Sequence, residues 1–130
     1  MKNRVLVVED QELNRELLCD WLEAEGYEAS AAADLKAAYD VFAKQAPHAV
    51  LLDINLGGEN GLDLLKWMWQ KSEFAEIPVI AVTAHAMVTD QDRIMRAGCR
   101  ACLSKPVEFR VLRDELKRWL QHAKTPQLDS

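Results

Sequence analysis

The sequence has 130 residues, 49% of them hydrophobic and 28% charged, which is typical of one globular domain. Its longest apolar runs have about the length of one strand, so no segment is a candidate membrane span. The N-terminus lacks the apolar core of roughly 7–15 residues that a secretory signal peptide needs. We therefore expect a cytoplasmic protein that does not act on membranes.

The net charge of −5 is unevenly distributed along the chain. Residues 1–92 hold 7 basic and 17 acidic side chains, a net charge of −10, whereas residues 93–124 hold 9 basic and 3 acidic ones, a net charge of +6. The positive part can present a face to an acidic partner, although ordinary solvent-exposed helix faces explain it at least as well. We expect no nucleic-acid binding, because the basic residues of the last helix fit such a face on an acidic protein; they are Arg110, Arg113, Lys117 and Arg118.

Apolar strands of four or five residues alternate with helical patterns, starting with a strand over 5–8. A helix over about 11–25 follows, and Gly26 ends it. A weak strand over 28–31 precedes a helix that Asp34 caps and that stops before Pro47. The third strand covers 49–52, and Asp53 directly follows it. The residues predicted to face the core from the two helices are Leu13, Leu17, Leu18, Trp21, Leu22, Leu35, Ala38, Tyr39 and Phe42.

In the second half, Gly61 opens a helix, a strand over 79–82 follows, and a short helix over 90–97 ends at Gly98. A strand over 101–104 and a helix over about 107–122 complete the pattern. Trp67 and Trp69 are two positions apart on a helix, so they cannot both face the core. The residues predicted to face inward are Leu62, Leu65, Met68, Trp69, Val111, Leu112, Leu116, Trp119 and Leu120.

Five such units with near-continuous apolar strands predict an α/β fold with a doubly wound, five-stranded parallel sheet. We assign residues 1–122 to this domain and expect residues 123–130 to form a frayed tail.

Polar side chains follow four of the predicted strands at the point where each strand ends. Because open α/β sheets bind ligands outside the carboxyl ends of their strands, we expect these side chains to meet at one edge. Three carboxylates, a hydroxyl and an ammonium there would suit a divalent cation and a phosphoryl group. The residues are Glu9, Asp10, Asp53, Thr83 and Lys105.

The acidic pair Glu9-Asp10 would repel a bare phosphate, so it indicates a hard cation, and Mg²⁺ prefers such oxygen ligands. Asp53 is then a second metal ligand, a nucleophile that forms an aspartyl phosphate, or both. The backbone carbonyl of Asn55 can also face the cation. Lys105 offers a point positive charge to phosphoryl oxygens, a cis peptide bond to Pro106 is plausible, and Thr83 offers a hydroxyl.

The spacing Cys99-x-x-Cys102 raises the question of a redox or zinc site. Residues three apart on a strand lie roughly 10 Å from each other, too far for a disulfide. A zinc site would need two further ligands at suitable spacing, and the histidines are scattered. We therefore interpret Cys99, Cys102 and Cys19 as structural thiols.

On the basis of these residues, the chain resembles the receiver domain of two-component response regulators. The resemblance is to the chemotaxis-regulator type and covers essentially the whole length. Segments 7–14 and 82–87 are most similar to stand-alone cell-division regulators of alphaproteobacteria and to receivers of hybrid sensor kinases. The matching residues are Glu9, Asp10, Asp53, Gly61, Thr83, Lys105 and Pro106.

The resemblance implies a flavodoxin-like receiver fold and Mg²⁺-dependent phosphotransfer, with Mn²⁺ as a possible substitute. Asp53 would accept a phosphoryl group from a phosphohistidine of a histidine kinase or phosphotransfer protein, and would lose it slowly. Asp10, Asp53 and the Asn55 carbonyl would hold the ion directly, and Glu9 through water. Lys105 and Thr83 would bind phosphoryl oxygens. The phosphodonor would dock on the first helix and the loop after the fifth strand.

The resemblance also implies a downstream protein partner that binds the fourth helix, fifth strand and fifth helix. Two positions depart from the family pattern. Cys102 occupies the place of the switch aromatic, and Gly57 that of a loop proline, which should make this loop more mobile. Our hypothesis is that phosphorylation is read through this loop and the fourth helix. We expect His85 to be an exposed bystander.

Alternatives to a single-domain response regulator also fit parts of the sequence. The chain could be a receiver excised from a hybrid histidine kinase, or a receiver-like interaction module that is never phosphorylated. A phosphatase of the haloacid dehalogenase type is disfavoured, because such enzymes need a second aspartate two residues after the nucleophile, where this chain has Asn55.

Overall fold

The computed structural model describes residues 2–84 and 87–129, and His85 lies outside this range. Its principal strands are β1 (Arg4–Val8), β2 (Glu28–Ala32), β3 (Ala49–Asp53), β6 (Val79–Thr83) and β7 (Ala101–Ser104). Its helices are α1 (Glu12–Ala24), α2 (Leu35–Lys44), α3 (Leu62–Trp69), α4 (Val88–Arg96) and α5 (Phe109–Asp129). The two-residue strands β4 (Asn55–Leu56) and β5 (Glu59–Asn60) form a small hairpin that the sequence did not predict.

The five principal strands form one parallel sheet in the order β2-β1-β3-β6-β7. The chain adds β2 on one side of β1 and then crosses to add β3, β6 and β7 on the other. This reversal between β1 and β3 is the place where doubly wound sheets bind ligands, at the carboxyl ends of the strands. The predicted fold class is therefore confirmed.

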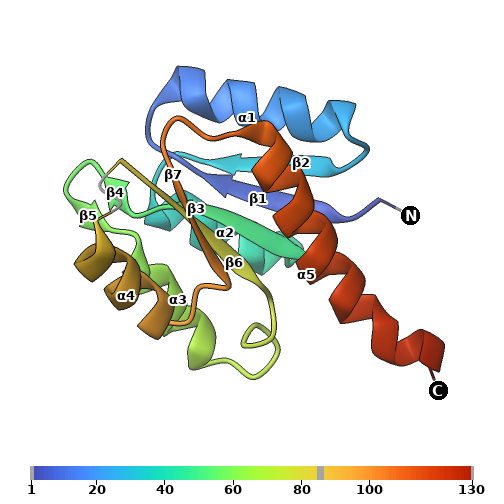
Figure 1. Ribbon diagram of the computed structural model, residues 1–130. Helices are drawn as coiled ribbons and strands as arrows, with labels where there is room; N and C mark the ends of the chain where they lie inside the picture. The colour runs from blue at the N-terminus through green and yellow to red at the C-terminus, as the bar shows by residue number, and fades with distance from the viewer. Residues whose placement is uncertain (1, 85–86, 130) are drawn as a thin grey trace.

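Helices cover both faces of the sheet, with α1 and α5 on one face and α2, α3 and α4 on the other (Figure 1). Each face has its own apolar core. The face under α1 and α5 buries Val5, Val7, Leu18, Leu22, Ala49, Leu51, Ile80, Ala101, Leu112, Leu116 and Leu120. Strand β3 is buried along its whole length, which explains its continuous run of apolar residues up to Asp53.

The predicted N-cap of α2 is confirmed, because the Asp34 side chain accepts a hydrogen bond of 2.8 Å from the backbone N–H of Ala37. The C-x-x-C spacing forms no disulfide, and the three cysteines are free. Burial raises the pKa of the Cys99 thiol to about 12, with a smaller contribution from Cys102. Cys99 is part of the apolar core, as expected of a structural thiol.

Four residues predicted to face the core are instead exposed: Leu13 by 81%, Leu17 by 55%, Trp69 by 55% and Val111 by 38%. Helix α1 buries only Leu18 and Leu22 fully, because its apolar stripe is wider than the surface that the sheet covers. The inward assignment of these four residues was therefore wrong. The expectation that one of the two tryptophans of α3 is exposed is confirmed, since Trp67 packs against Tyr39, Phe42 and Phe74.

Helix α5 is longer than predicted, with helical backbone up to Asp129. The division into a domain at 1–122 and a frayed tail at 123–130 stays a prediction. Within the described ranges, no helix is long and apolar enough to cross a membrane.

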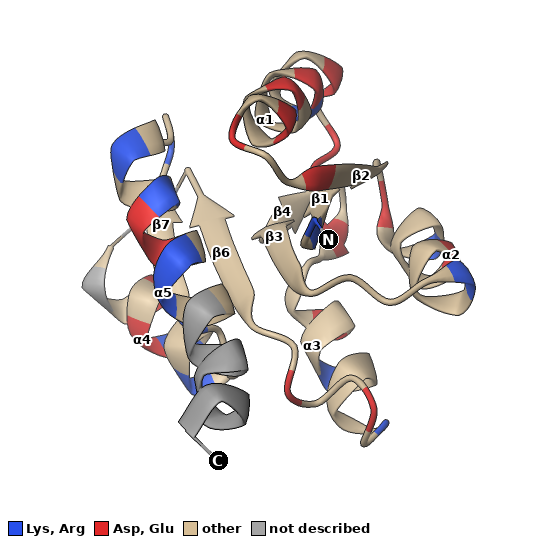
Figure 2. Ribbon diagram, turned by 90° about the vertical axis from the view of Figure 1, so that its right-hand side faces the viewer, with Lys and Arg blue, Asp and Glu red and all other residues tan. Residues whose placement is uncertain are grey.

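Charge is segregated in space as it is along the chain. Acidic side chains predominate on α1, and lysines and arginines on the described part of α5 (Figure 2). The two helices are joined by an ion pair in which Arg113 donates two hydrogen bonds, of 2.8 and 3.1 Å, to the Glu25 carboxylate. These hydrogen bonds lower the pKa of Glu25. Part of the positive face is therefore engaged within the molecule.

Candidate functional site

Polar residues gather at the carboxyl ends of four neighbouring strands, as predicted. Glu9 follows β1, Asp53 ends β3, Thr83 ends β6, and Lys105 follows β7. Glu9, Asp53 and Thr83 are the three polar or charged residues that the described structure buries, with exposed fractions of 2%, 4% and 2%. Parallel pairing aligns these strand ends, since Asp53 is opposite Val82 and Thr83 is opposite Ser104.

Lys105 bridges the two buried carboxylates. Its Nζ lies 3.0 Å from Oε1 of Glu9 and 3.0 Å from Oδ2 of Asp53. Burial would lower the pKa of Lys105, but the hydrogen bonds to Glu9 and Asp53 outweigh it, and the pKa is raised. Two buried carboxylates would repel each other if left unpaired, and the ammonium between them offsets this repulsion. The Lys105–Pro106 peptide bond is cis.

Backbone N–H groups hold the remaining oxygen of each buried carboxylate. The N–H of Gln11 donates to Oε2 of Glu9 at 3.0 Å, and the N–H of Asn55 donates to Oδ1 of Asp53 at 3.1 Å. The Arg15 guanidinium also donates to the Glu9 carbonyl at 2.9 Å. Sequence reasoning missed both contacts, because the Gln11 donor and the Glu9 acceptor of the Arg15 bond are backbone groups, which have no signature in the side-chain pattern.

Asp10 completes an acidic cluster with Glu9 and Asp53, in which one possible ligand atom from each residue lies within 4.8 Å of the others. Asp10 is exposed, and within the described residues no donor contacts its carboxylate. Hard carboxylate oxygens with access to water are the environment that Mg²⁺ prefers, since the ion keeps several waters. These residues therefore fit a magnesium ion.

Two glycines let the chain close around the acidic cluster. A Cβ at Gly57, which has φ +50°, would lie 3.1 Å from Oδ2 of Asp10. A Cβ at Gly61 would lie 2.5 Å from the backbone carbonyl oxygen of Asp53, too close for any other residue. Gly57 and Gly58, both with positive φ, form the turn of the β4–β5 hairpin, as such turns require. The mobility predicted for this loop stays a prediction.

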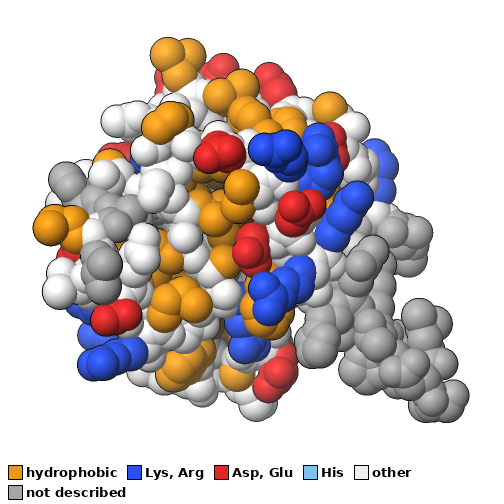
Figure 3. Space-filling view, in the orientation of Figure 1, with side chains coloured by type: hydrophobic (Ala, Val, Ile, Leu, Met, Phe, Trp, Pro, Cys, Tyr) orange, Lys and Arg blue, Asp and Glu red, His pale blue; other side chains and the backbone are white. Residues whose placement is uncertain are grey.

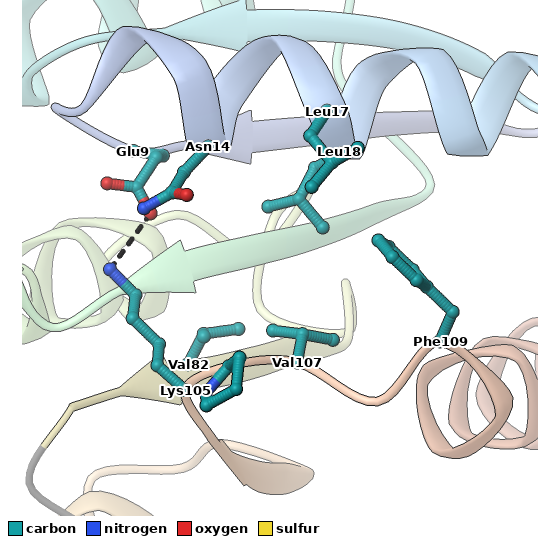
Figure 4. Close-up of a pocket in the computed structure, with 9 residues that line it drawn as sticks. Glu9, Asn14, Leu17, Leu18, Val82, Lys105, Val107 and Phe109 are labelled. Atoms are coloured by element: carbon teal, nitrogen blue, oxygen red, sulfur yellow. Dashed lines mark ion pairs between the residues drawn. The ribbon is translucent and has the colours of Figure 1, made fainter.

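Two pockets flank the site. A small one of about 130 Å³ lies between α4 and Thr83; it is lined by Ile54, Asn55, Thr83, Asp90, Arg93 and Ile94. A larger one of about 460 Å³ opens between α1 and the segment before α5. Glu9 and Lys105 reach it from one end, and Leu17, Leu18, Val82, Val107 and Phe109 form its apolar part (Figure 4).

Comparison with known proteins agrees with this geometry. The family model of the response regulator receiver domain matches residues 5–117. The chain belongs to the response regulator receiver family. The polar-differentiation response regulator DivK of Brucella anthropi is 40% identical over 123 residues, which are 95% of this receiver and all of DivK.

Solved structures show the same fold. A crystallised signal receiver domain from Vibrio parahaemolyticus matches with a TM-score of 0.88 and 26% identity, over 100% of this receiver and 98% of that chain. NtrX from Brucella abortus matches with a TM-score of 0.87 and 29% identity, over 98% of this receiver but only 29% of NtrX. The receiver fold predicted from the sequence is confirmed.

Proposed function

We propose that this receiver is a single-domain response regulator that accepts a phosphoryl group on Asp53 and signals through altered protein–protein contacts. The phosphodonor is a phosphohistidine of a histidine kinase or histidine phosphotransfer protein. The observation that carries the proposal is the buried Asp53 carboxylate, paired with Lys105 within an acidic cluster that fits Mg²⁺. Aspartyl phosphate formation is established carboxylate chemistry.

In the transfer, a carboxylate oxygen of Asp53 forms a bond to phosphorus while the phosphorus–nitrogen bond to the donor imidazole breaks. Bound Mg²⁺, or Mn²⁺ in its place, would neutralise charge on the phosphoryl oxygens. Asp10, Asp53 and the Asn55 carbonyl would hold the ion, and Glu9 through water. Lys105 and Thr83 would bind phosphoryl oxygens, Lys105 by moving from the carboxylate to the new phosphoryl group. Slow hydrolysis of the aspartyl phosphate would end the signal.

The pocket between α1 and the segment before α5 supports the predicted docking site for the phosphodonor. Leu17 lines the pocket and is 55% exposed, and Leu13, one turn earlier, is 81% exposed. Exposed apolar side chains beside a concave surface are typical of protein-binding sites. A donor seated there would bring its phosphohistidine to Asp53, because Glu9 and Lys105 line the same pocket.

Helix α4 supports the predicted output face made by α4, β7 and α5. Its residues Asp90, Arg93 and Ile94 line the pocket that Thr83 and Asn55 share. A shift of Thr83 towards a phosphoryl group would therefore act directly on α4. Cys102, half-buried on β7, has no ring to rotate, so the loop and α4 carry the change.

The test is Mg²⁺-dependent beryllofluoride binding to the wild type and to Asp53→Asn, followed by tryptophan fluorescence with an NMR check that both proteins are folded. Saturable binding by the wild type and none by the variant is expected. Absence of binding in a folded wild type would contradict the proposal and favour the alternative of a receiver-like module that is never phosphorylated. A receiver excised from a hybrid kinase would pass this test, and the length of the native gene product distinguishes it. The cytoplasmic location stays a prediction.

A further inference from the structure

A separate cleft of about 570 Å³ lies near the amino ends of β6 and β7, at the end of the sheet opposite to Asp53. It is formed by the end of α3, the segment before β6, the end of α4 and the segment before β7. Its lining residues are Trp69, Ala75, Ile77, Met95, Arg96, Gly98 and Arg100. None of them contributes to the pockets around Asp53 and Thr83.

The apolar part of this cleft is exposed yet held in place. Trp69 is 55% exposed and Met95 is 44% exposed. The Trp69 ring lies directly on the backbone of Gly98, where a Cβ would overlap the ring, and Gly98 has φ +111°. A large aromatic surface fixed in this way loses little conformational freedom on binding, so it is well suited to receive an apolar side chain.

The polar part of the cleft is positive. Arg96 and Arg100 line it, and within the described residues neither forms an ion pair with a carboxylate. The Arg100 guanidinium stacks over the Trp119 ring, 5.4 Å from its centroid, which orients it. Hydrophobic side chains are visible at the surface over α4 and between α4 and α5, with basic groups beside them (Figure 3).

We propose that this cleft binds an acidic segment of a partner protein. Carboxylates of the segment pair with Arg96 and Arg100, and an apolar side chain packs on Trp69 and Met95. Two guanidinium groups that have no carboxylate partner among the described residues, beside exposed apolar surface, complement such a segment in charge and in hydrophobicity. Nucleic acid is disfavoured, because the chain carries a net charge of −5 and two arginines neutralise few phosphates.

The cleft is connected to the phosphoacceptor site by α4. Met95 and Arg96 are at the end of this helix, and Asp90, Arg93 and Ile94 of the same helix line the pocket beside Thr83. The inference therefore extends the proposed output face around the end of α4 to α3. In this respect it rests on the proposed function, and the experiment keeps the two apart.

The experiment titrates the ¹⁵N-labelled full chain with two synthetic peptides, with Mg²⁺ and with or without beryllofluoride. One peptide is acetyl-EEDLLEEL-amide, and the other has lysine at every acidic position. We expect the acidic peptide to shift the Trp69 side-chain N–H and the amides of Gly98 and Arg100. Loss of either arginine, in Arg96→Gln or Arg100→Gln, should weaken binding about tenfold, since a hydrogen bond to a charged group is lost.

Arg110→Gln is the matched control, because it removes one charge from the basic part of the chain outside the cleft. Equal binding of the lysine peptide, equal weakening by Arg110→Gln, or no shifts at the cleft at millimolar peptide would overturn the inference. The Trp69 signal is also followed against protein concentration when no peptide is present. If it shifts and that shift is lost in Arg100→Gln, the cleft binds a second copy of this chain and not a partner segment. The beryllofluoride response of Asp53 in the same sample reports separately on the proposed function.

Discussion

The ammonium of Lys105 lies 3.0 Å from the carboxylate of Asp53, although 52 positions separate the two residues in the sequence. The same ammonium is 3.0 Å from Glu9, so one cation is shared by two carboxylates that are almost completely buried. Breaking such a pair leaves a buried charge without a partner, which is strongly unfavourable. Lys105 therefore has a structural role in the unphosphorylated protein as well as its proposed role towards the phosphoryl group.

Replacement of Lys105 tests both roles. We expect Lys105→Ala to lower the free energy of unfolding by about 2 kcal/mol without magnesium, because Glu9 and Asp53 then repel each other. Mg²⁺ should still bind and recover much of this loss, since the cation also offsets the repulsion between the two carboxylates. Urea denaturation with and without Mg²⁺ measures both effects, with exposed Lys117→Ala as the control. Phosphorylated Lys105→Ala should bind its partner poorly, and an unchanged partner affinity would contradict its proposed role.

The glycines of the β4–β5 turn allow a matched comparison at the metal site. Gly57→Ala should weaken Mg²⁺ binding several-fold, because its Cβ would press on the Asp10 carboxylate from 3.1 Å. Gly58→Ala also places an L residue at positive φ, but nothing lies within 4 Å of its Cβ. It should lose stability and keep its Mg²⁺ affinity. Calorimetric titration compares the variants, and equal losses of affinity would show that strain in the turn matters more than contact with Asp10.

The exposed leucines of α1 test the docking of the phosphodonor. We expect Leu13→Ser and Leu17→Ser to slow phosphotransfer from a phosphorylated kinase by about tenfold or more, since truncation of a central interface residue often costs over 1 kcal/mol. Labelling by acetyl phosphate should not change, because this small donor needs no docking surface. Trp69→Ala is the control, since Trp69 and Leu17 are equally exposed at 55%. Kinase labelling at the wild-type rate in both leucine variants would exclude this surface.

The buried thiol of Cys99 predicts a loss of stability in alkaline solution. Its pKa is raised from 9.0 to about 12, so above pH 9 the unfolded thiol ionises while the folded one keeps its proton. The contribution is fully present below pH 9 and is lost as the pH rises towards 12, by about 2 kcal/mol at roughly pH 10.5. Urea denaturation under reducing conditions should show a smaller alkaline loss for Cys99→Ala, which retains Lys105 and the tyrosines. Parallel losses in both proteins would assign the effect to those other groups.

The presence of Cys102 on β7 predicts which elements change when Asp53 is phosphorylated. With beryllofluoride bound, we expect NMR shifts at Asp53, in the β4–β5 hairpin and along α4, and little change around Cys102. The physical reason is that α4 shares a pocket with Thr83, whereas β7 carries no aromatic ring that could move between two positions. Large shifts confined to β7 and its neighbours would refute this route.

The sequence alone was sufficient for the five principal strands and for the residues at their ends. The central strands β1, β3 and β6 are buried on both faces, so their apolar runs are nearly continuous and the polar residue at the end of each run is conspicuous. Since parallel strands place their carboxyl ends at one edge, the meeting of Glu9, Asp53, Thr83 and Lys105 followed from the order of the elements. The N-cap at Asp34 was equally local, because the side chain bonds to a backbone group three residues away.

Only the tertiary structure determined which apolar helix residues are covered. Leu17 and Leu18 are neighbours in the sequence and line the same pocket, yet Leu18 is 7% exposed and Leu17 is 55% exposed. Periodicity identifies an apolar stripe, but the sheet and the neighbouring helix determine how much of that stripe has a packing partner. Likewise, the pairing of Lys105 with both carboxylates and the contact of Trp69 with Gly98 depend on distances between elements far apart in the chain. The residue types at the site follow from local pattern, whereas their contacts follow from packing.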